Sequence, residues 1–159
     1  MAQLDERFLD VDAHGSLRVP GVLWLGMAFL ARYFILALGL VFSHSQELLD
    51  ALFTNKFVWM VLVLEIPAVA LLMAGANRGP EGAAAWRMLW LRGRVIIAAL
   101  AALHVLYASW MLWTSDVWRP WPELLLASCA LLDIAIAYGV HTDGFFKQLF
   151  SEFPAPTVK

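Results

Sequence analysis

Four long apolar stretches dominate this sequence and leave few folds open to it. They cover residues 20–43, 57–74, 94–114 and 121–140. A transmembrane helix needs about 20 mainly apolar residues, which these lengths match. No strand-like alternation of apolar and polar residues accompanies them. We therefore predict an all-α fold, an integral membrane four-helix bundle with short interfacial helices.

The composition supports a membrane as the solvent. The chain is 62% hydrophobic and only 15% charged, whereas soluble domains are about half apolar and about a quarter charged. A domain of this size has too little core to hide such an excess. The net charge of −2 provides no basic surface for nucleic acid, so we expect the lipid bilayer as a partner and no nucleic acid.

Lysine and arginine distribution predicts the orientation, because these residues are retained on the cytoplasmic side. The second and third stretches are joined by an arginine-rich loop, and further basic residues precede the first stretch and follow the fourth. The two opposite loops carry only Lys56 and Arg119. We predict a cytoplasmic N-terminal segment at 1–19, a four-span domain at 20–140 and a cytoplasmic amphipathic tail at 141–159.

Each predicted span contains one ionisable residue away from its ends. These residues are Arg32, Glu65, His104 and Asp133. At about 1.5 Å of rise per residue, they fall near the middle of a hydrocarbon core about 30 Å thick. A charge at that depth costs at least about 2.5–3.5 kcal/mol, so we expect the four to face one another.

The neighbours of this polar layer extend the prediction. Tyr107 lies one helical turn beyond His104, so its phenol could join the network. Pro67 follows Glu65 and removes a helix hydrogen bond to Val63, which predicts a kink there. With Arg32 charged, one proton shared among the two carboxyl groups and the histidine would make the layer neutral, and a low dielectric favours that total. The layer is expected to act as helix-joining glue, as part of a subunit contact, or as a proton or small-molecule site.

Two flanking segments are amphipathic and supply candidates for an interface. The candidates are Trp86, Trp90, Phe145, Phe146, Leu149 and Phe150. The phenylalanine-rich segment is interpreted either as a helix lying in the inner headgroup region or as a helix that binds a partner.

Motifs for catalysis and cofactors are not found in the sequence. There is no Gly-x-Ser-x-Gly, no His-Glu-x-x-His, no phosphate-binding glycine loop and no cysteine cluster. The single Cys129 offers neither a disulfide nor metal-ligand spacing. We therefore predict no catalytic residue, no metal and no cofactor, and the sequence favours a protein that is not an enzyme.

The segment before and into the first span resembles a known family. It contains Asp12, His14-Gly15, Leu17, Pro20, Leu23-Trp24-Leu25 and Arg32. This pattern resembles the YfeZ-like family of small uncharacterised inner-membrane proteins of Gram-negative bacteria. The resemblance implies a multi-pass protein of the bacterial inner membrane and no established activity, so no catalytic residue is carried over.

Two functions from different classes follow. The first is an accessory or scaffold subunit of a membrane complex, which contacts a membrane-protein partner or a second copy of itself. The alternative is a small channel, proton-handling or quinone-associated module built on the intramembrane layer.

Overall fold

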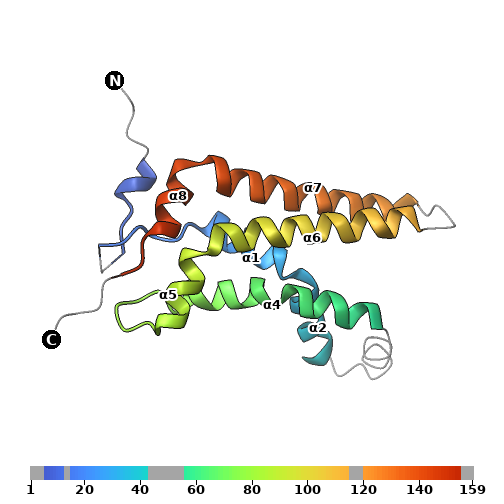
Figure 1. Ribbon diagram of the computed structural model, residues 1–159, viewed down its shortest axis with the longest axis horizontal. Coiled ribbons are helices and arrows are strands. Elements are labelled where there is room, and N and C mark those ends of the chain that lie inside the picture. The colour runs from blue at the N-terminus through green and yellow to red at the C-terminus, as the bar shows by residue number, and fades with distance from the viewer. Residues whose placement is uncertain (1–5, 13–14, 43–55, 115–119, 155–159) are drawn as a thin grey trace.

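The computed structural model describes residues 6–12, 15–42, 56–114 and 120–154. These residues form a short 3₁₀-helix and seven α-helices (Figure 1). The elements are η1 Glu6–Leu9, α1 Gly21–Leu30, α2 Arg32–Phe42, α4 Lys56–Ala76, α5 Ala84–Leu91, α6 Gly93–Trp113, α7 Pro120–Thr142 and α8 Gly144–Ser151. The all-helical class is therefore confirmed for the described part of the chain.

Three of these helices, α4, α6 and α7, are long and apolar enough to cross a membrane. Their bounds lie close to the predicted second, third and fourth spans. Hairpin-like packing joins α6 to α7, while α4 packs against α1 and α6. Three to four helices of this length and composition indicate a membrane protein.

The first predicted span differs from the expectation of one continuous helix. The chain forms α1 and α2 instead, and the two helices are bent by 76° at Ala31. In Figure 1, α2 turns away from the α6–α7 pair and lies beside α4. The kink predicted at Pro67 is not where the chain breaks, since α4 continues as one helix through that residue.

The short helices α5 and α8 close one end of the helical fold, and most of the predicted interface residues lie inside this packing. Trp90, Phe145, Phe146, Leu149 and Phe150 are all buried within the chain. The Trp90 indole donates to the Leu149 carbonyl at 3.0 Å, and its ring lies 4.7 Å from that of Phe150. The apolar face of α8 is thus covered by its own protein, and its role in binding a partner stays a prediction.

The segment before α1 folds back to the same end as α8. Gly15 has φ of 74°, a left-handed value that glycine adopts without strain, in a turn closed by the Asp12 and Ser16 backbones. His14 lies outside the described residues. Arg78 donates to the Leu17 carbonyl and, at 3.3 Å, to the Glu152 carbonyl.

Arg78 therefore ties the N-terminal segment, the α4–α5 loop and the C-terminal tail together. Burial lowers the pKa of its guanidinium from the ordinary value, and the nearby carboxylates of Asp12 and Glu152 oppose that shift. A second tie is the ion pair of Arg7 with Asp143 at 2.8 Å. The segment before α1 and the segment around α8 thus meet at one end of the fold, and the cytoplasmic placement of this end stays a prediction.

Gly93, the first residue of α6, allows α8 to approach closely and offers a test of this packing. A Cβ there would lie 2.3 Å from the Phe150 ring, whereas a Cβ on Gly139 would meet nothing within 4 Å. Overpacking costs about 1–3 kcal/mol, and alanine recovers up to about 1 kcal/mol of helix propensity. We predict that Gly93→Ala lowers the free energy of unfolding in detergent while Gly139→Ala does not. Equal stability of the two variants would show that α8 is not held against Gly93.

Candidate functional site: an ionisable cluster at the broken helix

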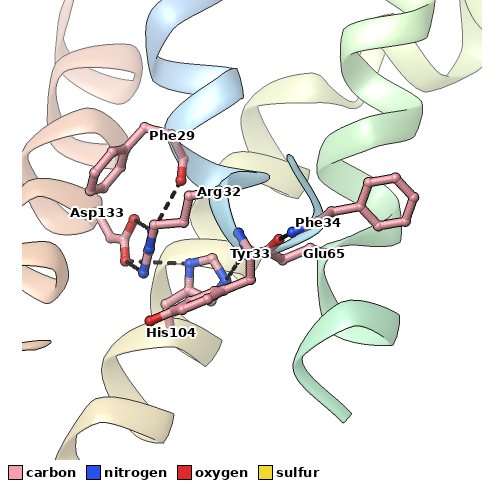
Figure 2. A network of polar contacts seen from close by, with 7 residues as sticks. All are labelled: Phe29, Arg32, Tyr33, Phe34, Glu65, His104 and Asp133. Atoms are coloured by element: carbon pink, nitrogen blue, oxygen red, sulfur yellow. Dashed lines mark hydrogen bonds and ion pairs between the residues drawn. The ribbon is translucent and has the colours of Figure 1, made fainter. Parts of the chain in front are cut away.

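The structure brings Arg32, Glu65, His104 and Asp133 into one buried network (Figure 2). They come from α2, α4, α6 and α7 respectively, so each long element contributes one side chain. Glu65 and Asp133 are fully buried, and His104 and Arg32 are 3% and 14% exposed at the side chain. We call these four residues the ionisable cluster.

Arg32 pairs with Asp133 through two parallel hydrogen bonds. Its Nη1 donates to Asp133 Oδ1 at 2.9 Å and its Nη2 donates to Oδ2 at 3.0 Å. The guanidinium also lies over the rings of Phe29 and Tyr33, at 4.6 and 5.0 Å from their centroids. This bidentate geometry is the strongest arrangement for a buried arginine and carboxylate.

Glu65 does not pair with the arginine but binds the start of α2. Its Oε1 accepts from the Tyr33 backbone amide at 3.3 Å, and its Oε2 accepts from the Phe34 amide at 2.7 Å. Figure 2 shows the carboxylate lying against the first turn of that helix. The first amides of a helix have no partner within it and carry a partial positive charge, so a buried carboxylate is well placed there.

These contacts explain the bend between α1 and α2. Residues 28–35 contain no proline or glycine. In a continuous helix, the Tyr33 and Phe34 amides would bind the carbonyls of Phe29 and Leu30. Both amides bind Glu65 instead, and the Phe29 carbonyl accepts from Arg32 Nη1 at 3.1 Å.

A side chain inserted into the helical hydrogen-bond ladder is a known cause of a kink. A hydrogen bond to a charged group contributes about 1.5–3 kcal/mol, against about 0.5–1.5 kcal/mol for an ordinary one. The exchange of two neutral hydrogen bonds for charged ones therefore favours the bent form. The bend is produced by tertiary contacts of Glu65 and Arg32, not by a helix-breaking residue.

His104 lies between the two carboxylates. Its Nδ1 is 3.3 Å from Asp133 Oδ2 and its Nε2 is 3.7 Å from Glu65 Oε1. Neither ring nitrogen makes a hydrogen bond in the part of the chain that the structure describes. An imidazolium can donate from both nitrogens, whereas a neutral imidazole can donate from only one. Each ring nitrogen faces one carboxylate.

Other predicted residues lie elsewhere. Tyr107 is half-buried and makes no hydrogen bond to the cluster among the described residues, so the aromatic neighbours of Arg32 are Phe29 and Tyr33. Trp86 is half-buried beside a hollow of the α4–α5 loop. Across residues 6–12, 15–42, 56–114 and 120–154, no group of three or more His, Cys, Asp or Glu could hold a metal ion.

The sequence reasoning missed the backbone amides of Tyr33 and Phe34 as members of this site. They become donors only because the helix breaks, and residues 28–35 contain no helix-breaking signal. The one available signal was Glu65 itself. The predicted spans contain two carboxylates, Glu65 and Asp133, but only one arginine, so one carboxylate is left without it.

A family model described as a protein of unknown function, DUF2919, matches residues 7–152. The chain belongs to this family. The matched residues contain all of the ionisable cluster and every described α-helix. Neither the comparison with curated proteins nor that with solved structures gave a match. Membership of an uncharacterised family is thus confirmed, while the YfeZ-like name stays a prediction.

The Arg32–Asp133 pair supports a stability prediction. Removing one partner of a buried ion pair leaves an uncompensated charge and costs about 3–5 kcal/mol, whereas replacing both with apolar residues is often neutral. We expect Asp133→Asn to lower the free energy of unfolding in detergent by that amount, and the double variant Arg32→Met, Asp133→Leu to recover most of it.

Asp10→Asn is the matched control, because Asp10 pairs with Arg18 at 3.8 Å on an exposed surface. Exposed pairs contribute about 0–1 kcal/mol. If Asp133→Asn unfolded at the same denaturant concentration as Asp10→Asn, Arg32 would not depend on Asp133.

Proposed function

We propose that this chain is an accessory or scaffold subunit of a membrane complex, placed in a bacterial inner membrane with both termini in the cytoplasm. The observation that carries the proposal is the exposure of α7. Only 11% of the Trp121–Thr142 segment of α7 is buried, against 39% of the Trp59–Ala76 segment of α4 and 28% of α6. A long helix with so little cover in its own chain supports a role in packing against another protein.

Lipid also covers an exposed apolar helix, so the composition of the face matters. Ala135 and Gly139 lie one turn apart on α7 and line an apolar groove of about 280 Å³, whose other wall includes Gly26 of α1. Small residues at this spacing let two membrane helices approach closely. This supports a membrane helix of a partner, or of a second copy, as the contact at α7.

The ionisable cluster supports the same role by being closed. Its arginine, carboxylates and histidine face one another within one chain. A partner at α7 would therefore meet an apolar surface and would not need to neutralise a charge.

Ala135→Leu tests the proposal. The added side chain fills the groove, and we expect a tagged protein purified from membranes in mild detergent to lose its co-purifying partner or its own dimer at least 10-fold. Ala99→Leu is the matched control, since Ala99 is also exposed on a span but lies on α6. The proposal would be contradicted if both variants retained the same partner or dimer. It would also be contradicted if the unmodified protein purified as a monomer without a partner.

A second candidate is a proton-handling module, and the position of His104 between two carboxylates favours it. Such a module would conduct protons in liposomes without any partner. We expect Glu65→Gln to abolish a proton flux that Glu123→Gln leaves intact, because Glu123 is also a buried glutamate but belongs to α7 outside the cluster. A flux-free purified protein would exclude this candidate.

A further inference from the structure

We propose that His104, with Glu65 and Asp133, forms a binding site for one proton, and that the residence of this proton on His104 keeps Glu65 ionised and α2 in its bent position. The inference deepens the second candidate function. It concerns where the proton sits and what it controls, whereas that function concerns whether protons cross the membrane.

The first step is that Glu65 binds the first turn of α2, beside the Arg32–Asp133 pair. Apart from Arg32, whose side chain is 14% exposed, α2 contributes little to the core, and the helix packs mainly against α4, with α1 adjoining it. The Tyr33 and Phe34 amides have no partner within the helix, and both donate to Glu65. An ionised carboxylate has acceptor sites on both oxygens for these donors, while a protonated one turns one oxygen into a donor. The bend therefore depends on the charge of Glu65.

The second step is a count of charge. Arg32 supplies one positive charge, and Glu65 and Asp133 each supply one negative charge when ionised. A neutral His104 would leave an excess negative charge in a region of low dielectric, which is costly. A second proton on the imidazole makes the cluster neutral and gives each carboxylate a facing N–H group.

The third step assigns the proton among the three candidates. Asp133 already accepts two hydrogen bonds from Arg32, and Glu65 already accepts two from backbone amides. Hydrogen bonds to the charged form favour ionisation of a carboxyl group. His104 is buried with two unpartnered nitrogens, each directed at a carboxylate oxygen. The imidazole is therefore the group that holds the proton.

The surroundings of His104 complete the electrostatic picture. The titratable and charged groups that surround it are Glu65 from α4, Asp133 from α7, and Arg32 with Tyr33 from α2. Tyr107 lies one turn away on its own helix, and α1 contains no titratable residue. When His104 is replaced by a neutral residue, Glu65 is the carboxyl group without a cation, so it takes up the proton and releases the α2 amides.

Distance measurements between spin labels test this consequence in lipid nanodiscs. Labels at Val41→Cys in α2 and Leu125→Cys in α7, in a Cys129→Ala background, report the position of α2. Residue 41 lies about 15 Å from Ala31 along the helix, given a rise of about 1.5 Å per residue, so straightening a 76° bend would move it by about 18 Å. We expect the same distance in the parent protein and in Glu123→Gln, and a shifted one in Glu65→Gln.

His104→Gln separates the proton from simple packing. Near neutral pH we expect its label distance to match that of Glu65→Gln, because Glu65 is then protonated. Raising the pH removes that proton and should return the distance to the parent value, whereas Glu65→Gln should not respond. An unchanged distance in either variant, or a shift in His104→Gln that ignores pH, would overturn the proposal.

Spectroscopy of folded protein locates the proton directly, even where these variants fail to fold. The chain has four histidines, so His14→Gln, His44→Gln and His141→Gln together leave His104 as the only imidazole. Its nitrogen resonances should show both positions protonated near neutral pH, and the infrared spectrum should lack a carboxylic-acid band from Glu65. A neutral imidazole, or a carboxylic-acid band from Glu65, would contradict the assignment of the proton to His104. Proton flux in liposomes is a separate measurement, so the site and the second candidate function can fail independently.

Discussion

The neutralisation of charge in a low-dielectric interior is the constraint on which this structure depends. Exposing the Arg32 charge to lipid would cost free energy. The side chain is turned toward Asp133, and that ion pair joins α2 to α7. Glu65 is left without the arginine and binds the backbone of α2 instead. The bend between α1 and α2, the approach of α4 to it and the position of His104 all follow from distributing two carboxylates over one arginine.

The sequence predicted the features that lipid imposes and missed those that depend on neighbours. The bounds of α4, α6 and α7 could be predicted because a membrane requires long apolar helices, and the inward direction of the four ionisable residues follows from the cost of exposing them. The partner of Arg32 could not be chosen, since Asp133 and Glu65 differ only through the order of helices. The break at Ala31 carries no proline or glycine, whereas Pro67 occupies a helix that does not break. The sequence pattern of the apolar stripe of α8 is equally compatible with contact to lipid, to a partner or to the protein's own core.

Arginines of the α5–α8 end have two uses at once. Lysine and arginine near membrane spans set the orientation of a chain. A prediction of orientation counts the two residue types together and treats them as interchangeable charges. Here Arg78, Arg87 and Arg94 each donate to backbone carbonyls of a distant segment. Because the guanidinium offers several donors in a planar fork, a lysine at these positions would keep the charge while losing part of the tie. The arginines from which the orientation is predicted thus also hold this end of the fold together.

The order in which the chain is made gives the Arg32–Asp133 pair a further meaning. The two residues are separated by 101 positions. At synthesis rates of about 5–20 residues per second, Asp133 is made about 5–20 s after Arg32. During that interval Arg32 has no Asp133 to pair with, so this ion pair forms only after α7 has been made. The pair thus joins one of the earliest helices of the chain to one of the latest, and this closure of the fold waits until most of the chain exists.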